Sequence, residues 1–119
     1  MQIMLMADYE CFPLWCSIDG GVSENIDPAS LAISIGLQQQ IDTWDEQYQA
    51  TYVADNPVVS GFSDATVKAS FVEQGYQLIQ ALQREFLSQG LNEVDCVYFD
   101  ISSNTRQAID SQQSRINRT

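Results

Sequence analysis

Histidine is absent from this sequence of 119 residues. Its absence removes the side chain that most often serves as a general base, as a zinc ligand and as a member of a hydrolytic triad. Carboxylate pairs could still carry out acid–base chemistry, and Asp8 with Glu10 or Asp45 with Glu46 are the candidates. Neighbouring residues on a helix point apart, however, and such pairs are common in a chain with 16 acidic residues. We therefore predict that the protein is not an enzyme.

Positive charge is also scarce, and none occurs in the first half of the chain. The first basic residue is Lys68, and the formal net charge is −11. A surface of this kind repels nucleic acid and anionic lipid, and it attracts cationic proteins over distances set by the ionic strength. We therefore expect a protein partner and no direct binding to nucleic acid or to membranes. The alternative at this point is that the charge only keeps the protein soluble.

Signals for secretion and for metal binding are weak. The chain opens Met-Gln-Ile-Met-Leu-Met, which has no basic residue and too short an apolar run for a signal peptide, so we expect a cytoplasmic protein. Cys11, Cys16 and Cys96 form an odd set without Cys-x-x-Cys spacing, which favours free thiols and no cofactor. Three thiolates with an aspartate could hold zinc, but small, partly buried side chains are the simpler interpretation.

Three short runs of residues have the character of strands. Residues 2–7 contain an apolar run, residues 14–18 precede a turn at Asp19-Gly20-Gly21, and residues 93–99 alternate between β-forming side chains. We expect the last strand to pair with the first. The pair would be parallel if residues 14–18 form a hairpin arm and antiparallel otherwise, and the sequence leaves this open.

Two longer segments have helical periodicity. Apolar residues at spacings of three and four, with Ser34 as the cap, predict a helix that runs to about Ala54 and ends before a proline. A second helix is predicted from Ser63 as its cap to Gly90 as its stop. The first helix carries an aromatic stripe, which we interpret as core rather than as a ligand cleft: Trp44, Tyr48 and Tyr52.

The short connector between these helices predicts that they pack antiparallel, which brings Trp44 near residues 73–75. Gly75 lies there, and we expect it to make room for the indole. The predicted fold is a two-layer α+β domain with a small sheet of two or three strands packed against an antiparallel helical hairpin. Residues 1–100 would form this single domain, and residues 101–119 a polar tail that is frayed or weakly helical.

The stretch from Ala7 to Pro28 is the candidate binding segment, because it combines carboxylates with aromatic side chains and contains no basic residue. Carboxylates beside aromatic rings suit Arg and Lys of a protein partner. The predicted contact residues are Asp8, Tyr9, Glu10, Trp15, Asp19, Glu24 and Asp27. As an alternative, Phe12 and Trp15 could instead close the open end of the sheet.

Several motifs carry a resemblance to known proteins. They are Met-Ala-Asp-Tyr-Glu-Cys-Phe-Pro-Leu-Trp (6–15), Glu-Asn-Ile-Asp-Pro (24–28), Trp44 with Tyr48, and Asp-Asn-Pro-x-x-Ser-Gly-Phe (55–62). Together, over roughly residues 3–99, they resemble small acidic bacterial immunity proteins of contact-dependent inhibition and related polymorphic toxin systems. The resemblance implies a cytosolic protein that binds one cognate toxin, commonly a cationic nuclease, and occludes its active site.

Two alternatives stay open beside this interpretation. The protein could be an acidic regulator or a nucleic-acid mimic that binds basic host proteins in general. The toxin-binding surface could also lie on the exposed face of the first helix, with Asp42, Asp45 and Glu46, instead of on residues 7–28.

Overall fold

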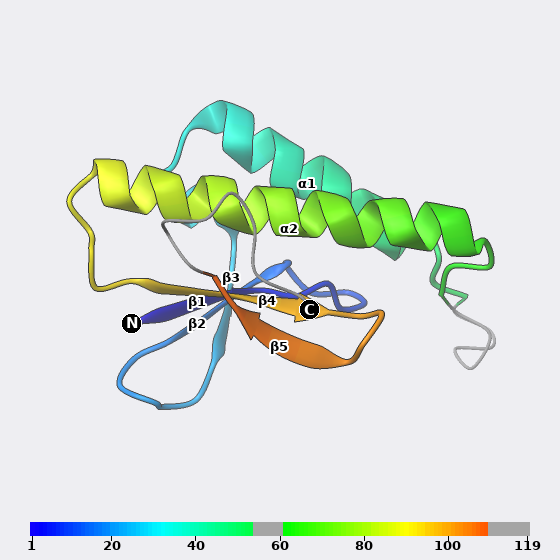
Figure 1. Ribbon diagram of the computed structural model, residues 1–119, viewed down its shortest axis with the longest axis horizontal. Helices are drawn as coiled ribbons and strands as arrows, with labels where there is room; N and C mark the ends of the chain where they lie inside the picture. The colour runs from blue at the N-terminus through cyan, green and yellow to red at the C-terminus, as the bar shows by residue number, and fades with distance from the viewer. Residues whose placement is uncertain (54–60, 110–119) are drawn as a thin grey trace.

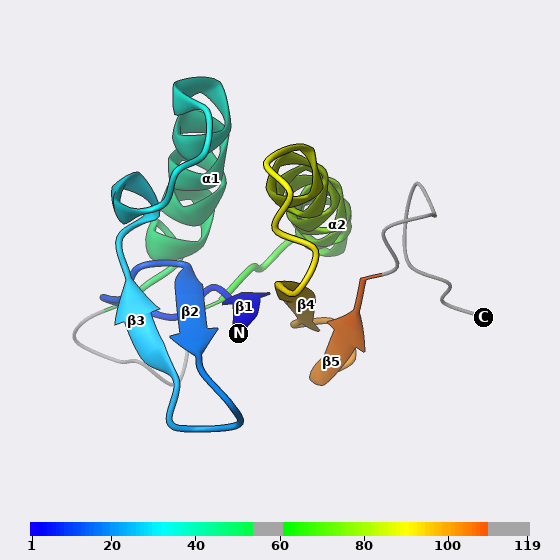
Figure 2. The same ribbon diagram turned by 90° about the vertical axis from the view of Figure 1, so that its left-hand side faces the viewer.

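The computed structural model describes residues 1–53 and 61–109, and it has the predicted α+β architecture. A five-stranded sheet forms one layer and two helices cover one of its faces (Figures 1 and 2). The strands are β1 (Gln2–Leu5), β2 (Leu14–Ser17), β3 (Glu24–Ile26), β4 (Asp95–Asp100) and β5 (Thr105–Ala108), in the spatial order β3-β2-β1-β4-β5. The helices are α1 (Ile35–Gln49) and α2 (Ala65–Ser88), and a short 3-10 helix, η1, spans Pro28–Ser30.

β1 and β4 form the centre of the sheet and run parallel. Leu5 of β1 lies between Leu14 of the antiparallel strand β2 and Tyr98 of β4. The first hairpin therefore exists, and it gives the parallel pairing that the sequence left as one of two alternatives.

The sheet is larger than the two or three strands that the sequence predicts. β3 has only three residues, and β5 is the largely polar run Thr-Arg-Gln-Ala. Both lie at an edge of the sheet, where a strand needs no continuous apolar pattern. The expectation of a frayed or weakly helical tail is thus wrong for residues 105–108, which pair antiparallel with β4. Residues 110–119 lie outside the described part of the chain.

Both helices begin at a capping side chain. The hydroxyl oxygen of Ser34 accepts a 3.2 Å hydrogen bond from the backbone N–H of Leu37, which confirms the predicted cap of α1. The cap of α2 is Asp64 and not the predicted Ser63, because the Asp64 carboxylate accepts a 2.8 Å bond from the N–H of Thr66.

The first helix ends earlier than predicted, at Gln49 rather than near residue 54. The Thr51 hydroxyl donates a 2.7 Å hydrogen bond to the carbonyl oxygen of Tyr48 and also contacts the hydroxyl of Tyr9 at 2.6 Å. The end of α1 therefore coincides with a contact between Thr51 and Tyr9, which is distant in the sequence. The stop predicted at residues 55–57 lies outside the described residues.

The core lies between the helices and the inner face of the sheet. Trp44 of α1 is 2% exposed, stacks on Phe71 of α2 with 4.4 Å between ring centroids, and donates its indole N–H to the Phe71 carbonyl at 2.9 Å. Ile3, Leu5 and Tyr98 meet these side chains from the sheet. The helices run in opposite directions above the sheet (Figure 1), and Ser34 at the start of α1 binds Glu85 near the end of α2.

Gly75 does make room for an aromatic ring, but the ring belongs to Tyr98 and not to Trp44. A methyl group on Gly75 would overlap the hydroxyl and ring atoms of Tyr98, which is fully buried. The Tyr98 hydroxyl also donates to the carbonyl oxygen of Val72 at 3.1 Å. The expectation for Trp44 was wrong because its indole stacks one turn earlier along α2, on Phe71.

Candidate protein-binding surface

The loop between β1 and β2, residues 6–13, is hydrogen-bonded to the last turns of α1 through the side chain of Gln49. The Gln49 amide nitrogen donates to the carbonyl oxygen of Asp8 at 2.7 Å and to the carboxylate of Asp45 at 3.2 Å. Its amide oxygen accepts from the backbone N–H of Glu10 at 3.0 Å. Gln49 therefore connects two carboxylate-bearing residues of the loop with one of the helix.

This attachment concentrates negative charge around the loop. Burial first, and then the charges of Asp8, Asp45 and Glu10, raise the pKa of the Cys11 thiol. Charges from both the loop and α1 therefore act on this one thiol, consistent with the hydrogen bonds of Gln49 that join the two segments. Cys11, Cys16 and Cys96 are free thiols, as expected from the sequence.

The same surface continues along α1. Burial raises the pKa of Asp42, and the charges of Asp27 and Glu46 raise it further. Burial also raises the pKa of Asp45, against the lowering effect of its hydrogen bond from Gln49. We use the name acidic surface for the carboxylates that these interactions link: Asp8, Glu10, Asp27, Asp42, Asp45 and Glu46.

Tyr9, a predicted contact residue, is held inside an aromatic cluster. Its ring lies 4.5 Å from the ring of Tyr48 and 4.8 Å from that of Tyr52, and its hydroxyl contacts Thr51. Burial, with the neighbouring Tyr9, raises the pKa of Tyr48 to about 12, so this phenol stays neutral. Tyr9 thus anchors the loop on α1.

Trp15 lies in β2 beside Met4 and is half-buried. Its indole N–H donates to the carbonyl oxygen of Met6 at 3.1 Å.

Phe12 is the exposed aromatic side chain of the loop, with 47% of its surface accessible. The Asn25 side chain holds the Phe12 backbone in place. Its amide oxygen accepts from the Phe12 N–H at 2.9 Å, and its amide nitrogen donates to the Phe12 carbonyl at 2.6 Å.

Asp19 and Glu24 belong to another part of the molecule. Glu24 pairs with Cys16 at the far end of β2, and Asp19 lies in the turn beyond it. The loop at residues 6–13 meets the opposite end of β2, where Leu14 begins the strand. The predicted contact residues are therefore not brought together: Asp8, Glu10 and Asp27 belong to the acidic surface, Tyr9 and Trp15 are supporting side chains, and Asp19 and Glu24 lie apart.

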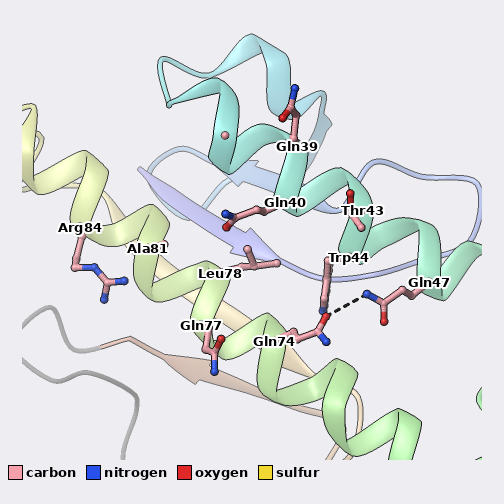
Figure 3. A pocket seen from close by; sticks show the side chains of 11 residues that line it. Gln39, Gln40, Thr43, Trp44, Gln47, Gln74, Gln77, Leu78, Ala81 and Arg84 are labelled. Carbon is pink, nitrogen blue, oxygen red and sulfur yellow. Dashed lines mark hydrogen bonds between the residues drawn. The ribbon is translucent and has the colours of Figure 1, made fainter.

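A groove of about 630 Å³ runs between α1 and α2 on their outer side (Figure 3). Amide side chains dominate its walls, and Gln47 donates to Gln74 across it at 3.1 Å. Trp44 and Leu78 line it as well, and the described lining includes Arg84 but no carboxylate or thiol. This groove therefore lacks the titratable groups that acid–base chemistry requires.

Residues 1–53 and 61–109 contain no group of three or more Cys, Asp or Glu side chains placed to hold a metal ion. Neither of the two described helices has both the length and the hydrophobicity of a membrane-spanning segment.

Two important residues of this surface did not stand out in the sequence. Gln49 follows Asp45 by four residues, a spacing that places both side chains on one helix face, and this is the signal that could have identified it. The sequence places Phe12 with Tyr9 and Trp15 among the aromatic residues of the acidic segment, and only the structure distinguishes its exposed ring from the other two.

One family model matches most of the chain. Residues 1–101 match the family described as Serratia CdiI immunity protein-like, so the match includes the whole acidic surface. No curated protein matches the chain.

Proposed function

Because the chain belongs to the Serratia CdiI immunity protein-like family, we propose that it binds a cognate toxin through the acidic surface and neutralises it. The observation that carries this proposal is the attachment by Gln49, which joins the carboxylates of the loop to those of α1. The exposed ring of Phe12 supplies an apolar contact beside them. We place this binding in the cytoplasm and assign the protein no catalytic role.

The chemistry of the surface favours a cationic partner. Raised pKa values at Asp42 and Asp45 mean that their charged forms are poorly compensated within the protein. Lys or Arg side chains of a partner would compensate these charges, relieve their repulsion by neighbouring carboxylates, and form charge-assisted hydrogen bonds. Such pairs would speed association and select the cognate toxin more than they would raise total affinity.

A nuclease is the toxin class that best fits this surface. An enzyme that cleaves nucleic acid presents Lys and Arg to the phosphate backbone, so its active site is a cationic surface. Carboxylates arranged over one face of the inhibitor would compete for those residues. We therefore propose that the acidic surface occludes the active site of a nuclease-type toxin.

We expect the cognate toxin to be encoded by the gene immediately upstream, and the test measures two double charge reversals against the C-terminal domain of that product. Asp8→Lys with Asp42→Lys alters the acidic surface, whereas Glu93→Lys with Asp95→Lys makes the same change in net charge elsewhere. All four side chains are exposed, so both variants should fold. We expect the first pair to weaken binding about 100-fold or more, because desolvated charge pairs are replaced by repulsion, and the second pair to change it only a few-fold.

Equal losses from both variants would contradict a local binding surface and indicate a general field effect. A wild-type protein that neither binds this toxin domain nor protects cells from it would contradict the proposed function. Comparable binding of the wild type to several unrelated basic proteins would favour the acidic regulator instead.

A further inference from the structure

The connection between β2 and β3 projects from the sheet on the side away from the helices (Figures 1 and 2). Pairing between the two strands ends at Cys16 and Glu24. We call residues 18–23 the hairpin tip. It lies at the opposite end of β2 from the loop that carries part of the acidic surface, so it forms a separate feature of the molecule.

The hairpin tip has a defined turn. Asp19 and Gly20 both have positive φ angles, 52° and 74°, and the N–H of Gly21 donates to the carbonyl oxygen of Ile18 at 2.9 Å. Positive φ at both central residues is typical of the two-residue turns whose twist matches that of the adjoining strands. A segment that is ordered before binding loses less conformational entropy when it binds.

The hairpin tip also exposes apolar side chains. Ile18 is 64% exposed and Val22 is 91% exposed, the highest value among the large apolar side chains of the described residues. Asp19 and Glu24 beside them are exposed and acidic, and no Lys or Arg precedes Lys68 in the chain. Two exposed branched apolar side chains within one short connection favour burial against a partner, and their acidic neighbours in sequence favour a cationic one.

We propose that the hairpin tip is a second docking element, which inserts into a concave site of the toxin lined by Lys or Arg and by apolar side chains. A projecting loop with a formed turn at residues 18–21 fits a concavity better than a flat surface. This inference rests on the proposed function and extends it, because the toxin is then held at both ends of β2. The apolar contacts at Ile18 and Val22 slow dissociation, and the charges of Asp19 and Glu24 speed association.

The experiment measures binding of the upstream-encoded toxin domain to three variants of the full chain. Ile18→Thr with Val22→Thr keeps β-branched side chains and removes apolar surface, and we expect Kd to rise about tenfold or more through faster dissociation. Asp19→Asn with Glu24→Gln keeps the side-chain shapes, and we expect slower association with a weaker salt dependence. Ile35→Thr is the control, since Ile35 is 71% exposed at the start of α1, and Kd should change less than about twofold.

Three results would overturn the inference. If both hairpin-tip variants bind the toxin like the wild type while Asp8→Lys with Asp42→Lys weakens binding, this inference fails and the proposed function stands. If the free protein forms a dimer that Ile18→Thr with Val22→Thr dissociates, the hairpin tip serves a second copy of the chain. If the wild type does not bind the toxin domain at all, both proposals fail together.

Discussion

At the scale of single residues, Gly75 shows what one missing side chain permits. Glycine in the interior of a helix costs about 1 kcal/mol relative to alanine, yet here it allows the ring of Tyr98 to lie against α2. The sequence correctly indicates a glycine that accommodates an aromatic ring. It misidentifies the ring, because helical spacing relates α1 to α2 but contains no information on which residue of β4 lies below Gly75.

The corresponding prediction concerns Gly75→Ala. Its methyl group overlaps a buried tyrosine that cannot move freely, so we expect a loss of about 1–3 kcal/mol in the free energy of unfolding despite the better helix propensity. Gly36→Ala is the control, because nothing lies within 4 Å of the added atom, and it should be neutral or slightly stabilising. Urea denaturation measures both, and equal stabilities would contradict the packing role of Gly75.

At the scale of elements, the long helices were predictable and the edge strands were not. Repeated apolar spacing identifies α1 and α2, and the capping side chain is predicted correctly for α1 but not for α2. The end of α1 coincides with a tertiary contact at Thr51. β3 and β5 carry short, polar sequences that are stabilised as strands by pairing with β2 and β4. Their own residues contain no pattern that predicts a strand. Hydrogen bonds from β2 and β4 hold β3 and β5 in the sheet.

The element most open to test is the loop at residues 6–13. Gln49→Ala removes the hydrogen bond to the Glu10 N–H, which contributes about 0.5–1.5 kcal/mol, so hydrogen exchange at this amide should accelerate about two- to tenfold. The melting temperature should change little, whereas toxin binding should weaken. Gln39→Ala, also on α1 but exposed, is the matched control. Unchanged exchange at Glu10 would show that the aromatic cluster around Tyr9 alone holds the loop.

At the scale of the whole molecule, two carboxylates of the acidic surface, Asp42 and Asp45, lower the stability of the folded state at neutral pH. The pKa values of Asp42 and Asp45 are raised in the folded state, so both carboxylates bind protons more readily there than in the unfolded chain. Their contribution to folding is therefore most favourable at low pH and is lost as the pH rises through the raised pKa values. At neutral pH, both groups oppose folding.

We therefore predict that Asp42→Asn with Asp45→Asn raises the melting temperature at pH 7 and weakens toxin binding. The gain should shrink as the pH falls toward 4, because the wild-type carboxylates then become protonated themselves. Thermal denaturation followed by circular dichroism from pH 4 to pH 8 measures this trend. A gain that does not depend on pH, or a lower melting temperature, would contradict this electrostatic account.

The pKa of Asp100 is shifted in the opposite direction to those of Asp42 and Asp45. Burial acts to raise its pKa, but hydrogen bonds from Ser102 and Tyr76 outweigh burial and hold the pKa below its usual value. Its stabilising effect is therefore present at neutral pH and is lost as the pH falls. Asp100 thus responds to acid in the opposite direction to Asp42 and Asp45.

The candidate binding surface was predictable only in part. Composition predicts Asp8, Glu10 and Asp27 as contact residues, and in the structure the charges of Asp8 and Glu10 act on Cys11 and that of Asp27 acts on Asp42. The sequence treats the carboxylates of α1 as an alternative location, whereas the fold places both sets on one surface. The separation of Asp19 and Glu24 could not be read from the chain, because it follows from the direction in which β2 crosses the sheet.

The parallel pairing of β1 with β4 has a consequence for the timing of synthesis. Gln2 pairs with Asp95, so the two central strands come from opposite ends of the matched family region. A ribosome that adds about 5–20 residues per second must work for on the order of 5–20 s before the partner of β1 exists. Until then the apolar side chains of β1 have no neighbouring strand on that side. The proposed neutralisation of a toxin therefore requires molecules completed at least through β4, made before the toxin is met.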